Sequence, residues 1–304
     1  MDDILARVDD AWRRCGSDRD ALERELLAIR ADVAAEYGTE SAAYVTMCNE
    51  LGTFYRVTAN YKKGEAVFFE ALAGIEAIAG RHDQYATCMD NLAELYRLDG
   101  RLDECEATVR EAEGYFTDEH SLEYAACINY QGHLACARHD FERGLALYTK
   151  ALGIVEENGS PAFHASTAYA NIANVLQTLG RLDEAAAYLA RARAIYDAGE
   201  LSKGAHYIAL LNSLALLHEQ MHDDAQAKQV FDAEVDDMSR VPTSPIDALI
   251  SLVNAGRFYA RTKDVAGLRT VLGFVDRLAA LDRIQGHQVL VRTLEEAKAW
   301  RELV

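Results

Sequence analysis

Apolar residues recur at helical spacing along this 304-residue chain, and the same pattern returns about every 41 residues. A Gly or Ala lies in the middle of the first apolar stretch of each good copy, with successive steps of 41, 39, 41, 42 and 41 residues. These six anchor residues are Gly52, Ala93, Gly132, Ala173, Ala215 and Gly256. A period this regular predicts a repeat architecture in which each copy is one structural unit.

Each copy predicts two helices joined by a tight turn. In the second copy, Leu92, Ala93 and Tyr96 share one helical face, a break follows at Gly100, and residues 102–112 continue the pattern. Small residues alternate with large ones because two helices approach closely only where one side chain is small. All three prolines fall between copies, where one helix ends and another begins. No segment predicts a strand.

The copies resemble the tetratricopeptide repeat, whose consensus has Leu followed by Gly or Ala, an aromatic residue three positions later and a Gly at the turn. The resemblance is carried by Leu51-Gly52-Tyr55, Leu92-Ala93-Tyr96-Gly100 and Ile172-Ala173-Leu176-Gly180. The third copy departs from it at Gln131 and Ala135, and the fifth at His218, His222 and Asp224. The period exceeds the usual length of about 34 residues, so it is similar to the long variant of kinesin light chains and of many bacterial proteins.

This resemblance implies an all-α, right-handed superhelical solenoid of antiparallel helix pairs. Six good repeats are expected over residues 39–284. Residues 1–38 predict a degenerate, highly charged helix pair and residues 285–304 a single amphipathic helix; both are expected to cap the array, because a terminal repeat has one face without a neighbour. The side chains expected to cover the last pair are Val289, Val291, Leu294, Ala297 and Trp300.

In the family, the first helices of successive copies line a concave groove. This sequence places an Asn on that side of all six copies, at Asn49, Asn91, Asn129, Asn171, Asn212 and Asn254. A carboxamide both donates and accepts hydrogen bonds, so a ladder of Asn suits the backbone of an extended peptide. Packed helices lie roughly 8–10 Å apart and an extended chain advances about 3.3 Å per residue, so one Asn would hold about every third peptide residue.

The register of these Asn residues leaves a second interpretation open. Asn91, Asn171 and Asn254 precede the anchor by two residues and the other three by three, a difference of about 100° around a helix. The six therefore cannot all point in the same direction. In the alternative interpretation, Asn side chains bridge adjacent first helices inside the scaffold.

Further polar residues are expected on the groove: Arg56, Arg97, Tyr130, His133, Asn174, Gln177, Arg257 and Arg261, opposed by Glu50, Asp90, Glu94 and Glu219. Arg56 and Arg97 hold equivalent positions and could form forked contacts with a partner's carboxylate. Pairing with a Glu of the same helix is the alternative. No Lys occupies the expected groove positions, so the carboxylate clamp of the family's chaperone-binding members is not expected here.

Charge and composition limit the partners. The formal net charge is −18, whereas binding to nucleic acid or an anionic membrane depends on clustered Lys and Arg, so neither partner is expected. The start, MDDILARVDD, does not resemble a secretion signal, and no apolar run is long enough to span a bilayer, so a cytoplasmic location is expected. The six cysteines form no C-x-x-C pair, and most of them are expected to be small core residues.

Signals for chemistry are weak. The chain has no glycine-rich phosphate loop, no H-E-x-x-H and no G-x-S-x-G. His218 and His222 have the spacing closest to a metal site, but His222 falls at a predicted turn. His133, Cys136 and His139 come closest to a nucleophile with a base. We therefore expect no metal, no cofactor and no enzyme activity.

The leading hypothesis is a non-enzymatic interaction scaffold that binds an extended segment of a partner protein in its groove. The Asn ladder would hold the backbone, and the side chains would be selected by Arg56, Arg97, Tyr130, His133 and Arg257. One alternative is a regulator resembling bacterial peptide-pheromone receptors, which changes its superhelical pitch on binding. Others are self-association through the terminal helices and an enzyme with a polar pocket around His133.

Overall fold

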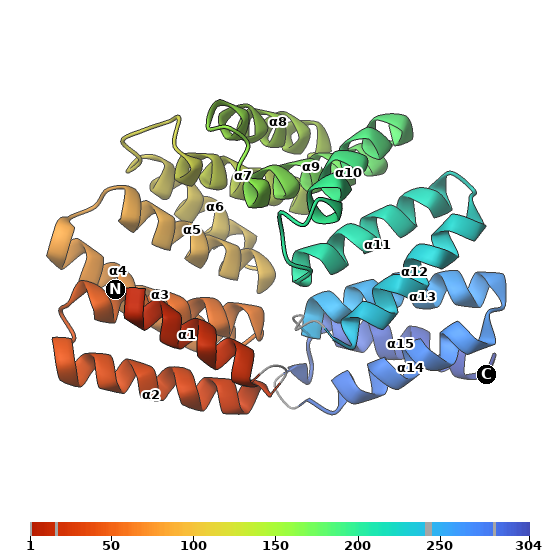
Figure 1. Cartoon of the computed structure of the whole chain (residues 1–304), viewed down its shortest axis with the longest axis horizontal. Helices are drawn as coiled ribbons and strands as arrows, with labels where there is room; N and C mark the ends of the chain where they lie inside the picture. The colour runs from red at the N-terminus through yellow and green to blue at the C-terminus, as the bar shows by residue number, and fades with distance from the viewer. Residues whose placement is uncertain (1, 16–17, 241–244, 282–283) are drawn as a thin grey trace. The chain divides into compact units, whose positions relative to one another are not determined.

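The computed structural model describes residues 2–15, 18–240, 245–281 and 284–304, and every regular element in these ranges is helical (Figure 1). Pro242 lies outside the described residues. The chain divides into two compact units, Met1–Asn158 and Gly159–Val304, called unit 1 and unit 2 below. The prediction of an all-α helical-repeat solenoid is confirmed.

Unit 1 is built from four consecutive helix pairs. Its helices are α1 (Asp2–Cys15), α2 (Arg19–Tyr37), α3 (Ala42–Val57), α4 (Tyr61–Ala79), α5 (Asp83–Leu98), α6 (Leu102–Glu113), α7 (Leu122–Ala137) and α8 (Phe141–Glu157). Each helix packs against its pair partner, and the first helices α3, α5 and α7 also pack side by side. The first helices therefore form one continuous layer within the unit.

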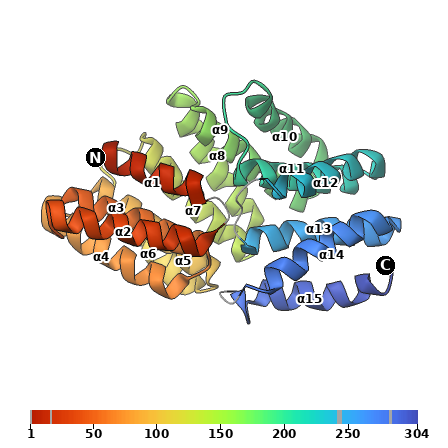
Figure 2. The ribbon, with the colours of Figure 1, turned by 60° about the horizontal axis from the view of Figure 1, so that its bottom comes forward.

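Unit 2 repeats this arrangement with three pairs and a closing helix. Its helices are α9 (Ala162–Thr178), α10 (Leu182–Asp197), α11 (Ala205–Gln220), α12 (Asp224–Met238), α13 (Pro245–Thr262), α14 (Val265–Ala279) and α15 (Gln288–Arg301). The closing helix α15 packs against both α13 and α14 (Figure 2). It covers the face of the last pair that has no further repeat beside it.

The buried face of α15 differs from the one expected. Leu290, Thr293, Ala297 and Trp300 are buried, whereas Val291 is 46% exposed. The Trp300 ring lies on Gly256 of α13, where an added Cβ would stand 2.5 Å from Trp300 Cη2. This large contact sets the rotation of the helix, and the rotation turns Val291 outward.

Glycines allow the two helices of a pair to approach closely. A Cβ on Gly52 of α3 would lie 2.6 Å from the Phe68 ring of α4, and a Cβ on Gly132 of α7 would lie 2.5 Å from the Tyr148 ring of α8. In both pairs a flat aromatic ring therefore covers the backbone of the facing helix. The alternation of small and large residues in the sequence corresponds to this packing.

All six turns inside the good repeats share one backbone conformation. Each has a residue with φ between 59° and 80°, namely Ala59, Gly100, His139, Gly180, His222 and Lys263. The amide after that residue donates to a carbonyl five residues earlier, as Asn60 N does to Tyr55 O at 2.8 Å and Arg101 N to Tyr96 O at 2.8 Å. This Schellman closure satisfies carbonyls at the helix end but requires a left-handed residue, which only glycine adopts without steric cost.

The four non-glycine turns are therefore sites where stability can be gained. Ala59→Gly should raise the free energy of unfolding of unit 1 by about 0.5–1 kcal/mol, because it removes the clash between the Ala Cβ and the backbone. The matched change Gly100→Ala, at the same position of the next repeat, should lower it by about 1 kcal/mol. Urea unfolding followed by circular dichroism measures both, and effects of the same sign would contradict this account of the turn.

Candidate functional site

Four of the six predicted Asn residues of the first helices meet in two pairs. In unit 1, Asn91 Nδ2 of α5 donates to Asn49 Oδ1 of α3 at 3.3 Å. In unit 2, Asn254 Nδ2 of α13 donates to Asn212 Oδ1 of α11 at 3.2 Å. All four side chains are partly buried. These bonds are the scaffold bridges that the sequence left as an alternative.

Pairing explains the alternating register. An Asn three residues before the anchor meets an Asn two residues before the anchor on the next first helix, because adjacent first helices pack with a small offset. Each bond uses one donor of one carboxamide and one acceptor of the other. In the unit 1 pair, the amide hydrogens of Asn49 and the carbonyl of Asn91 take no part in the bond. A bridge and a contact with a peptide backbone are therefore compatible.

The other predicted carboxamides have different surroundings. Asn129 Nδ2 lies 3.5 Å from His133 Nε2 on the same helix, α7. Gln177 of α9 is 8% exposed and donates to the Ser213 carbonyl of α11 at 3.2 Å, so it joins two first helices within unit 2. Asn174 is exposed, and Asn171 is partly buried.

Three of the four predicted groove arginines pair with acids of the chain. Arg97 forms a bidentate ion pair with Glu94 of its own helix, in which its Nε and Nη2 each donate to a carboxylate oxygen at 2.7 Å. Arg257 forms a bidentate ion pair with Glu296 of α15, in which its Nε and Nη2 donate to the carboxylate oxygens at 2.8 and 2.5 Å. Arg261 contacts Asp224 at 2.8 and 3.0 Å and Glu219 at 3.0 Å. In each of the three arginines, the guanidinium group that could bind a partner's carboxylate already binds a carboxylate of this chain.

A polar cluster lies between α3, α5 and α7 of unit 1. Glu94 is buried, and burial favours its neutral form, but the Arg97 fork and the nearby His133 outweigh this effect and hold its pKa below the usual range. Tyr130 is partly buried, its ring lies edge-on to His133 at 5.9 Å, and Arg56 approaches its hydroxyl. The Arg56 Nε is buried and has no hydrogen-bond partner among the described residues.

Asp90 belongs to the scaffold and not to an open groove. Its side chain is only 2% exposed, and burial raises the pKa of its carboxyl well above the usual value. The nearby Cys127 thiol of α7 offsets only part of that effect, and the buried Asp90 Oδ1 has no hydrogen-bond partner among the described residues. Glu50, also expected on the groove, is partly buried, and burial raises its pKa as well. Neither carboxyl offers a partner a fully solvated negative charge.

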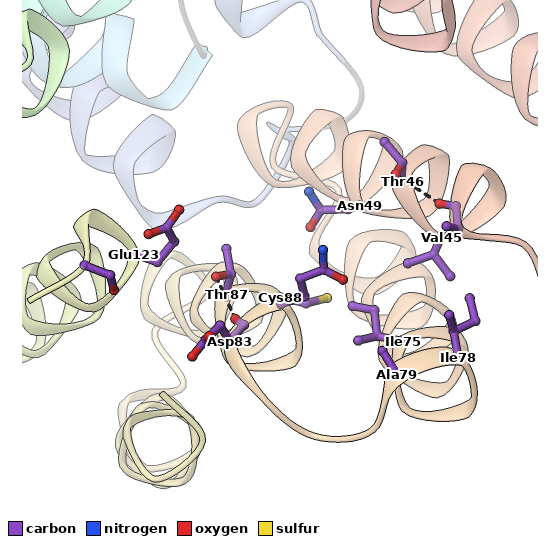
Figure 3. Close-up of a pocket in the computed structure, with 13 residues that line it drawn as sticks. Val45, Thr46, Asn49, Ile75, Ile78, Ala79, Asp83, Thr87, Cys88 and Glu123 are labelled. Atoms are coloured by element: carbon purple, nitrogen blue, oxygen red, sulfur yellow. Dashed lines mark hydrogen bonds between the residues drawn. The ribbon is translucent and has the colours of Figure 1, made fainter. Parts of the chain in front are cut away.

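A pocket of about 510 Å³ lies beside the Asn49–Asn91 pair of unit 1 (Figure 3). Four helices and the residue before α7 contribute to it. Its lining residues are Ala42, Val45, Thr46 and Asn49 of α3, Ile75, Ile78 and Ala79 of α4, Asp83, Gln84, Thr87 and Cys88 of α5, and Ser121 and Glu123 at the start of α7. The volume lies within the usual range for ligand pockets, roughly 300–1,000 Å³.

The pocket has two unlike walls. Ile75, Ile78 and Ala79, from the end of α4, gather on one side, whereas Glu123 stands on the opposite side (Figure 3). Asn49 lies between the two walls, near Thr46 of its own helix and Thr87 of α5. Both threonine hydroxyls donate to a carbonyl one turn earlier, at 3.0 Å for Thr46 and 2.9 Å for Thr87.

Asp83 is a fixed negative charge in the polar wall. Its two carboxylate oxygens accept from the Thr117 amide at 2.7 Å and the Thr117 hydroxyl at 2.8 Å. The backbone hydrogen bond, with the hydroxyl second, lowers the pKa of Asp83, because both bonds favour the charged form. None of the lining residues is Lys, Arg or His, so the pocket contains no internal countercharge for Asp83 or Glu123.

The residues with the strongest chemical signals in the sequence do not assemble into a reactive site. His222 has φ 60° at an exposed turn, Asp223 caps α12 by accepting from the Gln226 amide, and Asp224 pairs with Arg261. No group of three potential metal ligands exists within the described ranges. Burial raises the pKa of Cys136, which is opposite to the shift that activates a thiol.

Most of the cysteines lie in the core. Four of the six cysteines are buried, and burial raises the pKa of Cys48 to about 11 and that of Cys88 to about 12. Among the described residues, no helix combines the length and apolar character needed to cross a membrane.

Comparison with known proteins identifies the repeat. A sequence model of the tetratricopeptide repeat matches residues 41–116 and 124–198. A search of curated protein sequences finds no similar protein. Solved structures with the same fold include a Rap protein complexed with competence and sporulation factor (TM-score 0.56, 14% identity, 100% of this chain and 99% of that chain). A tetratricopeptide repeat protein from Parabacteroides merdae (TM-score 0.52, 14% identity, 98% of both chains) and BtubC from P. vanneervenii (TM-score 0.52, 16% identity, 81% and 90%) are also similar.

Sequence reasoning missed most of the pocket. It singled out Asn49 but not the apolar end of α4 or the acidic starts of α5 and α7. One signal was present, because Thr46 and Thr87 both stand six residues before their anchors, on the first helices of consecutive copies. The contribution of α4 has no such signal, since it depends on how the end of one helix meets the start of the next.

Proposed function

Because the chain belongs to the tetratricopeptide repeat family, whose fold mediates protein–protein interaction, we propose that it is a non-enzymatic scaffold that binds an extended peptide segment of a partner protein. The observation that carries the proposal is the unit 1 pocket, which opens over the first helices of three consecutive repeats beside the Asn49–Asn91 pair. The binding surface proposed here is this part of unit 1.

The Asn pair supports contact with a peptide backbone. The carbonyl and amide of an extended residue require one donor and one acceptor from the protein. The Asn49 amide hydrogens and the Asn91 carbonyl provide that combination, and the bond between the two side chains reduces the entropy lost on binding because it already orients them. Backbone recognition of this kind does not depend on the peptide's side chains.

Residues around the pair would select side chains. Arg56, Tyr130 and His133 lie together on α3 and α7 of unit 1 and provide donors and aromatic surface. Arg97 is paired with Glu94 and Arg257 with Glu296. Each arginine would contact a partner's carboxylate only after releasing its own. We therefore assign them mainly to the scaffold.

A random-peptide library selected on the native protein tests the proposal, with Asn91→Ala and Asn254→Ala as matched variants. Each variant breaks one Asn pair, but only Asn91 is next to the pocket. The native protein and Asn254→Ala should enrich the same peptides, and Asn91→Ala should bind them about tenfold more weakly through the lost contact. Failure of the folded native protein to enrich any peptide would contradict the proposed function.

A regulator that responds to a peptide is the second candidate. The similar Rap protein is in complex with competence and sporulation factor, and the likeness covers 100% of this chain. A change in the radius of gyration by X-ray scattering, when a selected peptide is added, would favour the regulator over a passive scaffold. An unchanged radius would favour the scaffold.

A further inference from the structure

We propose that the unit 1 pocket takes a bulky aliphatic side chain together with an adjacent Lys or Arg from the partner's extended segment. This inference rests on the proposed peptide-binding function and adds the chemistry of the partner. It follows from three observations: the apolar wall, the acidic wall and the distribution of charge between the two units.

The apolar wall has the properties of an anchor site. Ile78 is 48% exposed although it lines a concave surface, Ile75 and Ala79 lie on the same side of the pocket, and Ala42 and Val45 add apolar surface to its lining. Burying a Leu- or Ile-sized side chain there would remove apolar surface of both molecules from water, which contributes about 25 cal/mol per Å². A short peptide needs such an anchor because its backbone hydrogen bonds only replace bonds with water.

The acidic wall lies across the pocket from the anchor site. Asp83 and Glu123 contribute two carboxylates, and the Thr117 hydrogen bonds keep Asp83 charged. A Lys or Arg next to the aliphatic residue would put its cation within reach of this wall, since successive side chains of an extended segment point to opposite sides. An acidic residue at the same place would be repelled.

The two units differ strongly in charge. Unit 1 contains 31 Asp and Glu against 16 Lys and Arg, a formal net charge of −15, and unit 2 contains 18 against 15, a net charge of −3. A basic segment would therefore be attracted to unit 1 from a distance and would associate with it faster at low salt. Charge complementarity thus favours a basic partner segment over a second copy of this acidic chain.

The test is a random-peptide selection on the native protein, on Thr87→Trp and on Thr149→Trp. The Trp at position 87 fills the pocket. Thr149 is a matched control because it is an exposed residue of unit 1 on α8 whose hydroxyl donates to a carbonyl one turn earlier, as that of Thr87 does. The native protein and Thr149→Trp should enrich peptides with an aliphatic residue beside Lys or Arg, and Thr87→Trp should lose them.

The best enriched peptide is then titrated against charge variants by fluorescence anisotropy. Glu123→Lys should weaken binding about tenfold at low salt, and less as salt rises. Glu142→Lys, which makes the same charge change at an exposed site on α8, should weaken it by about twofold or less. Circular dichroism melts establish that each variant is folded.

The outcomes separate this inference from the proposed function. Enriched peptides without the aliphatic and basic pair, or with binding that survives Thr87→Trp, would overturn the inference while the peptide-binding function stands. No enrichment at all would overturn both. Concentration-dependent dimerisation of the native protein that Thr87→Trp abolishes would show that a second copy occupies the pocket, and would also overturn the inference.

Discussion

Glu234→Gln should stabilise unit 2 by on the order of 4 kcal/mol above pH 8 and have little effect near pH 5. Glu234 lies on α12, its side chain is 0% exposed, and neither carboxylate oxygen has a hydrogen-bond partner of good geometry among the described residues. Burial raises its pKa to about 8, and Ser251 of α13 only partly offsets that effect. Folding therefore favours the protonated acid.

The sign of the pH dependence follows from this raised pKa. Between the unfolded pKa of about 4.5 and the folded pKa of about 8, the folded state holds a proton that the unfolded state has released. The stability of unit 2 should therefore be highest below about pH 4.5, as far as this group is concerned, and should fall as pH rises toward 8. Glutamine keeps the shape and removes the charge, so the variant should lose this dependence.

One tryptophan lies in each unit, which makes the measurement specific. In a Trp12→Phe background, Trp300 fluorescence follows the urea unfolding of unit 2 at pH 5, 7 and 9. Glu295→Gln is the matched control because Glu295 is exposed on α15 and its replacement should change stability by less than about 0.5 kcal/mol. Parallel pH profiles for the native protein and Glu234→Gln would contradict the assignment.

Trp300→Ala should destabilise unit 2 by about 3–5 kcal/mol, the usual cost of removing a buried Trp side chain. Trp300 is buried and lies directly on the backbone of α13 at Gly256. Its loss leaves a cavity where α15 closes the last repeat, and domains are stable by only about 5–15 kcal/mol in total. We expect α15 to detach before the rest of unit 2 unfolds.

Hydrogen exchange locates this effect, and circular dichroism in urea measures its size. Amides of α13, α14 and α15 should exchange faster in Trp300→Ala, while those of unit 1 stay unchanged. Val291→Ala on the same helix is the control, since Val291 is 46% exposed and its truncation should cost less than about 0.5 kcal/mol. Equal effects of the two changes would show that α15 does not hold the end of unit 2 through Trp300.

The burial of Trp300 could be predicted from the sequence, whereas the burial of Glu234 could not. Trp300 was expected on the buried face of a closing helix because it continues an apolar stripe. Glu234 gave no such signal, since one acid within an amphipathic helix is usually solvated. Its burial appears only where α12 meets α13, so the pH dependence of unit 2 could not be predicted from the sequence.

For the Asn residues of the first helices, the sequence predicted the positions but not the contacts. The sequence located an Asn on every first helix and also contained the alternating register. It could not distinguish a bridge from a peptide contact, because that depends on the offset between adjacent helices. The bonds from Asn91 to Asn49 and from Asn254 to Asn212 show that the offset brings the side chains together.

By itself, the sequence determined the repeat, the helix pairs and the family of this protein, because helical periodicity and the spacing of small and large residues are local properties that recur in every copy. Only the tertiary structure decided the shape of the unit 1 pocket, the pairing of Asn and Arg side chains and the burial of Glu234. These features join residues from different repeats, some about 40 positions apart, and small offsets and rotations of packed helices determine which side chains meet.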